Sequence, residues 1–181
     1  PDVVDKEYVS RMLKNSKGCD TLIAEPDNYF VTSDKTYSEL EKLGHTKTVQ
    51  YFKKFEGNLN QSVLQHGDIW YNLKEAKKKF TLITGLNPDK RLFFAKFNEP
   101  TCINQRLIGF IPKLKSVDIN ICHALLNSVV GMFYIEATGF GRGAGALDLS
   151  KDKFADSFML NPSLLSEQQK QEIINAFIPL L

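Results

Sequence analysis

The sequence has 181 residues, of which 43% are hydrophobic, 24% charged and 11% aromatic. This supplies enough apolar side chains for one compact core, and the 13 Phe and 6 Tyr exclude an intrinsically disordered chain. No stretch approaches 18 consecutive apolar residues, so we expect no membrane partner, and the ordinary Gly and Pro content excludes collagen-like and low-complexity chains.

Charge is distributed unevenly along the chain. Between Lys42 and Lys115 there are 14 Lys and Arg against 5 Asp and Glu, whereas the remaining residues contain 9 against 16. A basic middle between acidic ends is typical of a surface that binds a polyanion such as a nucleic acid. Lysine-rich stretches such as 74–79 are also compatible with ordinary solvated surface.

The cysteines indicate a reduced compartment. Cys19, Cys102 and Cys122 are an odd number without short-range pairing, which predicts a cytoplasmic chain. We expect no metal site, because Cys and His lack the necessary spacing and the neighbours Cys122 and His123 cannot face one ion from a helix. The chain begins without a signal peptide or an initiator Met, so we expect a piece of a longer protein.

Helical spacing of apolar residues and strand-forming composition predict the elements of the first half. In chain order they are a helix over 5–15, a strand over 28–32, and helices over 36–43 and 46–55. Four strands follow over 69–73, 80–84, 91–97 and 107–111, with turn chemistry at 87–89 and 98–100.

The last third of the sequence reads mainly as helix. One long helix is predicted from Ser116 or Asp118 to about residue 137, with Gly139 as its C-cap. A glycine-rich loop over 139–146 and a short strand over 146–149 follow. A final helix over 167–177 begins with a capping box made by Ser166 and Gln169.

These elements predict an α+β fold. A mixed or antiparallel sheet from the central region is flanked by helices from both termini. We expect a single domain over 1–181, with a basic β-rich part over 42–115 and a helical part with the glycine-rich loop over 116–181.

Two enzymatic interpretations meet obstacles. The glycine-rich loop follows a helix and precedes a strand, so it faces the negative end of the helix, which disfavours phosphate. Pro26 and Asp27 with Glu75 and Lys77 formally match a metal-dependent nuclease pattern, in which carboxylates hold a divalent ion. The spacing is long and the stretch around Glu75 is polar, but the nuclease remains an alternative, as does a non-catalytic protein-interaction domain.

Five short motifs occur in a specific order between residues 5 and 162. They are E-Y-V-S-R-M-L-K-N-S (7–16), E-K-L-G-H-T-K-T-V-Q-Y-F (41–52), D-I-W-Y-N-L (68–73), N-Q-R-L-I-G-F-I-P-K (104–113), and A-L-L-N-S (124–128) with F-Y-I-E-A (133–137), Gly139 and G-A-G-A-L (143–147). This series resembles the C-terminal target-recognition domain of TaqI-like and type IIG adenine-specific DNA methyltransferases.

The resemblance implies recognition of a base sequence in double-stranded DNA. It also implies a methyltransferase catalytic domain on the same or a partner chain, which would use S-adenosylmethionine. Those enzymes hold the target adenine with an N-P-P-Tyr/Phe motif, but here Asn87-Pro88 is followed by Asp89 and Asn161-Pro162 by Ser163. We therefore expect no catalytic residues, no cofactor and no methyl transfer in this chain alone.

Asn, Gln and Arg make bidentate contacts to base edges, while Lys and Arg bind phosphates. The candidates for DNA contact are Asn104, Gln105, Arg106, Arg142, Lys77, Lys78, Lys79, Arg91, Lys96 and Lys113. Alternation along a strand leaves open whether Gln105 or Arg106 is buried against the sheet. Arg142 is equally compatible with capping the end of the preceding helix. Asn127 and Ser128 are expected inside that helix, contacting backbone.

Overall fold

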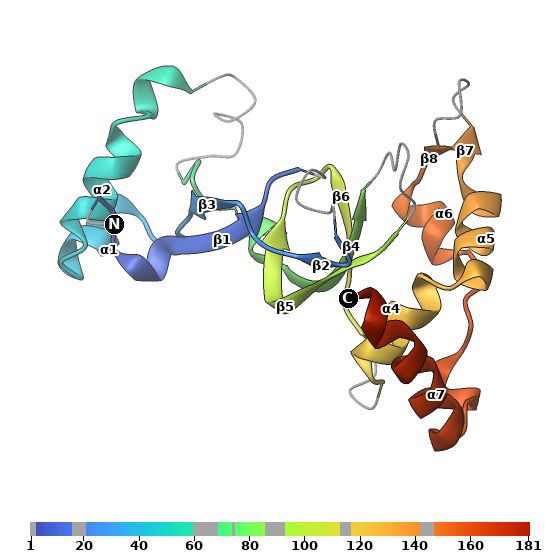
Figure 1. Cartoon of the computed structure of the whole chain (residues 1–181). Coiled ribbons are helices and arrows are strands. Elements are labelled where there is room, and N and C mark those ends of the chain that lie inside the picture. The colour runs from blue at the N-terminus through green and yellow to red at the C-terminus, as the bar shows by residue number, and fades with distance from the viewer. Residues whose placement is uncertain are drawn as a thin grey trace.

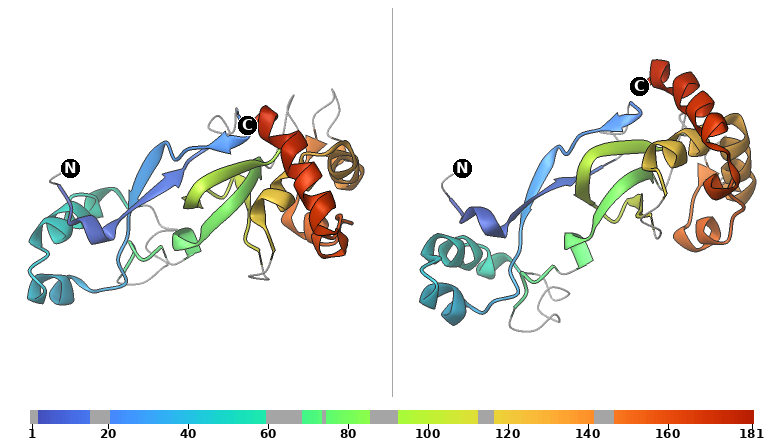
Figure 2. Two further views of the ribbon diagram at one scale, coloured as in Figure 1. Left: turned by 60° about the horizontal axis from the view of Figure 1, so that its bottom comes forward. Right: turned by 90° about the horizontal axis from the view of Figure 1, so that it is seen from below.

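A computed structural model describes residues 3–15, 21–59, 69–73, 75–85, 93–112, 117–141 and 147–181. In this part of the chain a mixed, curled β-sheet lies between two groups of helices (Figure 1). The helices at one end come from the N-terminal third and those at the other end from the C-terminal third (Figures 1 and 2). The predicted α+β architecture is therefore confirmed.

The strands and helices of the described residues have the following bounds. The strands are β1 (Val9–Leu13), β2 (Ile23–Ala24), β3 (Asn28–Val31), β4 (Lys79–Gly85), β5 (Ala95–Ile103), β6 (Leu107–Phe110), β7 (Phe140–Gly141) and β8 (Leu147–Asp148). The α-helices are α1 (Tyr37–Lys42), α2 (Thr46–Lys53), α4 (Ile119–Leu126), α5 (Val129–Thr138), α6 (Lys151–Ala155) and α7 (Glu167–Phe177). Short 3-10 turns are η1 (Lys6–Tyr8), η3 (Glu56–Asn58), η4 (Glu75–Lys77), η5 (Pro162–Leu164) and η6 (Ile178–Leu180).

The main sheet has the strand order β3-β1-β5-β4-β6, and β2 also pairs with β5. Strand β4 lies antiparallel between β5 and β6. On the other side of β5, β1 runs parallel to its end and β2 runs parallel to its start. Strand β5 is thus central to the sheet and contacts three other strands.

A large bulge interrupts the pairing of β5 with β4. Phe80 pairs with Thr101, but Leu82 pairs with Lys96, so two steps on β4 correspond to five on β5. Three extra residues are therefore accommodated in β5, around positions 98–100. We expected a turn there, and this prediction was wrong: the chain continues as a strand, and Pro100, which has no N–H for a ladder, fits the bulge.

The buried apolar residues form three clusters. One lies within the sheet, one joins the sheet to the C-terminal helices, and one joins the N-terminal helices to the segment around Tyr71. Phe97 of β5 and Phe94, just before β5, are almost completely buried; Phe97 belongs to the first cluster and Phe94 to the second. Burying each such aromatic side chain contributes on the order of 2 kcal/mol.

The predicted helix over 5–15 is instead the turn η1 followed by β1. The apolar spacing of Tyr8, Met12 and Leu13 satisfies both interpretations locally. Pairing decides between them, because β1 contacts β3 through four residue pairs and β5 through two. Leu13 is fully buried in the sheet cluster, which a solvent-facing helix would not provide.

No strand forms at 69–73, where Trp70 and Tyr71 lie in a turn. Tyr71 is buried and stacks on Phe52 of α2, with ring centroids 3.9 Å apart. Its hydroxyl donates to the Lys35 carbonyl at 2.9 Å. The aromatic side chains that predicted a strand therefore pack in the core of the N-terminal helices.

The long helix predicted to end near residue 137 is two helices, α4 and α5, bent by 67° at the break. Asn127 ends α4, and its side chain bonds both backbone groups of Phe94. Ser128 caps α5 by accepting from the Gly131 N–H at 3.1 Å. Both residues contact backbone as expected, but they do so at a helix boundary.

Several other elements follow their local signals, whereas the strand predicted over 91–97 begins only at Ala95 and runs on to Ile103 as β5. Thr36 and Ser166 form the capping boxes of α1 and α7, and the strand predicted over 80–84 is the middle of β4. Gly44 after α1 has φ +82°, a conformation that favours glycine. Among the described residues no single helix is long and apolar enough to cross a membrane; α4 and α5 together have that length and composition but are bent.

Candidate nucleic-acid interface

Three strands meet at one end of the main sheet. Cys102 of β5 pairs with Met12 of β1 on one side and with Lys79 of β4 on the other. The last residues of β1 and β5 therefore lie beside the first residue of β4. The residues at these strand ends, and those next to them in the chain, carry most of the described cations of the sheet.

We call this region the basic sheet end. It consists of six exposed cationic residues from three segments, namely Arg11, Lys14, Lys77, Lys78, Lys79 and Arg106. In the described part of the chain, no ion pair involves Arg11, Lys79 or Arg106. Because the sheet brings these charges together, this end of the molecule can attract a polyanion.

One acid does lie next to the basic sheet end. The Asp27 carboxylate accepts a hydrogen bond from the Lys14 backbone N–H at 2.9 Å. Burial acts to raise the pKa of Asp27, but hydrogen bonds from Lys14 and Asn28 outweigh it and hold the pKa below its usual value. Asp27 therefore stays ionised and fixes the end of β1.

The segment from Asn104 to Arg106 forms the turn between β5 and β6. The Asn104 side-chain oxygen accepts from the Arg106 N–H at 3.1 Å, and its backbone N–H donates to the Leu13 carbonyl at 3.0 Å. Gln105 and Arg106 are exposed at the tip, so neither is buried against the sheet. Asn104 positions the turn, which leaves Gln105 and Arg106 as the groups able to reach a partner.

The remaining candidates are placed differently. Lys96 lies toward the other end of β5 and donates to the Asn120 side chain of α4 at 2.7 Å, so it ties the sheet to a helix. Arg91, Lys113 and Arg142 lie outside the described residues.

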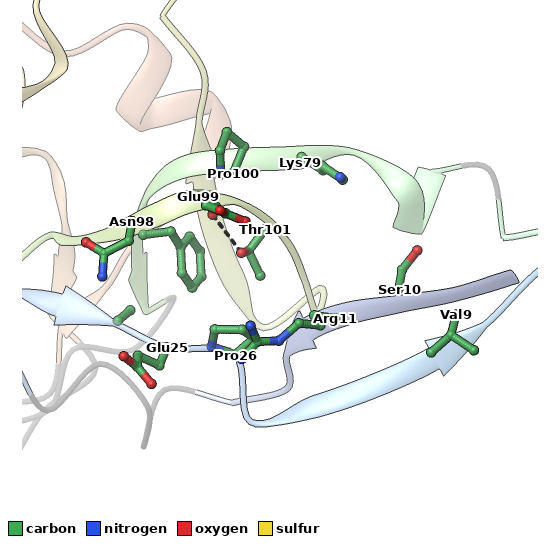
Figure 3. Close-up of a pocket in the computed structure, with 12 residues that line it drawn as sticks. Val9, Ser10, Arg11, Glu25, Pro26, Lys79, Asn98, Glu99, Pro100 and Thr101 are labelled. Atoms are coloured by element: carbon green, nitrogen blue, oxygen red, sulfur yellow. Dashed lines mark hydrogen bonds between the residues drawn. The ribbon is translucent and has the colours of Figure 1, made fainter. Parts of the chain in front are cut away.

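A groove of about 410 Å³ opens beside the basic sheet end, between β1, the segment after β2 and the bulge of β5 (Figure 3). We call it the β5 groove. Its polar lining consists of Ser10, Arg11, Glu25, Lys79, Asn98, Glu99 and Thr101. Arg11 and Lys79 therefore belong to both the groove and the basic sheet end.

The described residues give the metal-dependent nuclease no support. No group of three or more His, Cys, Asp or Glu side chains in this part of the chain could hold a metal ion. The Asp27 carboxylate is engaged with the backbone of Lys14. Burial raises the pKa of Cys102 and Cys122, which keeps both thiols protonated and disfavours a role as nucleophile.

Several polar residues of this region were not among the sequence-based candidates, and Arg11, Lys14, Asn98 and Glu99 are four of them. Arg11 and Lys14 were assigned to a helix, which hid their position beside β5. Asn98 and Glu99 were assigned to a turn. A proline following two polar residues inside a strand-like stretch is the signal that could have indicated a bulge.

Comparisons with known proteins bear on the fold. The chain is similar in structure to part of the type IIG restriction endonuclease BpuSI, with a TM-score of 0.57 and 14% sequence identity. The match covers 97% of this chain and 21% of that enzyme, so this chain spans a small part of its length. No family model matches the sequence, and no curated protein matches it either. The chain therefore has a fold found in a restriction–modification enzyme.

Proposed function

We propose that this chain is a sequence-specific DNA-recognition domain of a restriction–modification enzyme. The observation that carries the proposal is the convergence of six exposed cations from three segments at the basic sheet end. Double-stranded DNA is a dense polyanion, and side chains of this kind bind its phosphates. The structural similarity to part of BpuSI supports a role in a restriction–modification enzyme.

The finer proposal rests on the motifs in the sequence. We infer that the partner is the catalytic domain of an adenine-specific methyltransferase, on the same or another polypeptide in the cytoplasm. That domain would bind S-adenosylmethionine, and this chain would supply the choice of site. Incubation of this chain alone with DNA and labelled S-adenosylmethionine is expected to transfer no methyl groups.

The salt dependence of DNA binding tests the proposal. Each phosphate neutralised by a cation contributes about 0.9 to the slope of log affinity against log salt. Replacing Lys77, Lys78 and Lys79 by Gln should therefore flatten the slope by up to about 2.7. Binding to duplexes of unrelated sequence should weaken equally, because phosphates carry no sequence information.

The matched control replaces three exposed lysines on helices outside the sheet, Lys42 of α1, Lys47 of α2 and Lys151 of α6. This variant has the same net charge as the test variant and should keep the slope of the unmodified chain. Equal slopes in the two variants would place the lysine cluster off the interface. Absence of any salt-dependent duplex binding would favour a protein-interaction domain.

A further inference from the structure

The bulge of β5 presents three successive exposed residues, Asn98, Glu99 and Pro100, from the middle of a central strand. In a regular strand Glu99 would share a face with Phe97 and Thr101, which are 1% and 7% exposed. The register jump removes that constraint and turns Glu99 outward. Bulges of this kind re-aim side chains and occur often beside functional sites.

The bulge is held in place from within. The Thr101 hydroxyl donates to the Glu99 backbone carbonyl at 2.8 Å, and Thr101 itself is buried. Pro100 fixes the backbone further, because its φ is restricted and it has no N–H to pair. Asn98 and Glu99 therefore project from a constrained backbone, which is the arrangement that selective recognition requires.

The opposite wall of the β5 groove is open because the neighbouring strands stop short. Strand β1 pairs with β5 only at Cys102 and Ile103, and β2 pairs only at Lys96 and Phe97. The bulge thus faces a gap between these two strands. Arg11 from β1 and Glu25 from the segment after β2 line that gap (Figure 3).

The charges in the groove are balanced. Arg11 and Lys79 are cationic, Glu25 and Glu99 are anionic, and no ion pair forms among these four side chains. Two carboxylates disfavour a phosphate inside the groove. Base edges present both donors and acceptors, and they are recognised by Arg on guanine, Asn on adenine and Glu on the cytosine amino group.

We propose that the β5 groove reads base edges of DNA, with Asn98 and Glu99 as specificity-determining residues. This inference rests on the proposed function of DNA recognition. The cations of the basic sheet end bind the phosphates alongside, and Lys79 stands where the two surfaces meet. Glu99 accepts a hydrogen bond from an exocyclic amino group, and Asn98 contacts a neighbouring base.

The test uses the full chain and a library of duplexes with randomised sequence. Selection on the unmodified chain first establishes which base positions it prefers. Glu99→Gln is the main variant, because it keeps the size of the side chain and removes its charge. Asn98→Ala is the second variant. Glu136→Gln is the matched control, since Glu136 is an exposed acid on α5, outside the groove.

Glu99→Gln should lower the preference at one base position by about 5- to 150-fold. Its affinity for DNA of unrelated sequence should stay within about twofold, and its salt slope should not change. Asn98→Ala should lower the preference at a neighbouring position. Thermal melting of each variant checks that the fold is retained.

Different results overturn different claims. Failure of the unmodified chain to bind duplex DNA overturns the proposed function and this inference with it. Binding that depends on salt but keeps the same base preference in both groove variants overturns the inference alone. An even loss of affinity on all duplexes, with a changed salt slope, also overturns it, because it would assign Glu99 to the electrostatics of phosphate binding.

Discussion

Asn127 links the break between α4 and α5 to the start of β5. Its side-chain oxygen accepts from the Phe94 N–H at 2.8 Å, and its amide nitrogen donates to the Phe94 carbonyl at 3.0 Å and the His123 carbonyl at 2.9 Å. Phe94 is fully buried, so water cannot replace these bonds. We therefore expect Asn127→Ala to destabilise the fold strongly.

The magnitude follows from the three bonds. At a net value of about 1 kcal/mol each, their loss lowers the free energy of unfolding by about 3 kcal/mol. The Phe94 carbonyl keeps a second partner, His123 Nε2 at 2.8 Å, so the N–H of Phe94 is the backbone group left without a bond in the fold. For a chain of this size the melting temperature should fall by roughly 6–12 °C.

Urea unfolding followed by circular dichroism measures this change. Asn120→Ala is the matched control, because the Asn120 side chain accepts from Lys96 at an exposed site, where such a bond contributes less than about 1 kcal/mol. A loss below about 1 kcal/mol in Asn127→Ala would refute the reasoning. It would show that the helix break does not depend on the Asn127 side chain.

Two further predictions concern titration and recognition. Burial lowers the pKa of His123 to about 4, so the unfolded chain binds its proton first as pH falls. The free energy of unfolding should therefore decrease as the pH falls from about 6.5 to 4, by up to about 1.4 kcal/mol per pH unit. Urea titrations at several pH values measure this, and the free energy of unfolding of His123→Gln should depend less steeply on pH. An identical pH profile in the variant and the unmodified chain would contradict the prediction. Arg106→Lys should cost about 1–3 kcal/mol at one base position, because Lys cannot make the two-bond fork to guanine. Duplexes differing at single positions measure this, and an equal loss on all of them would instead assign Arg106 to a phosphate.

The sequence determined the elements whose signals are local. The capping boxes that begin with Thr36 and Ser166 fixed the starts of two helices, because each box satisfies backbone groups within four residues. The strand-forming composition of 80–84 likewise indicated β4. The basic middle of the chain was also visible without coordinates, whereas the exposure of Gln105 and Arg106 was left open by the sequence.

Only the tertiary structure decided how distant segments combine. Residues 9–13 become a strand because β3 and β5 offer partners, and their own spacing does not distinguish strand from helix. Asn127 ends a helix because Phe94, far away in sequence, supplies its hydrogen-bond partners. The β5 groove needs a bulge defined by register against β4 and a wall supplied by Arg11 of β1. Strand pairing and packing between segments far apart in the chain set these features. The local composition of a segment does not specify which other segment it will pair with.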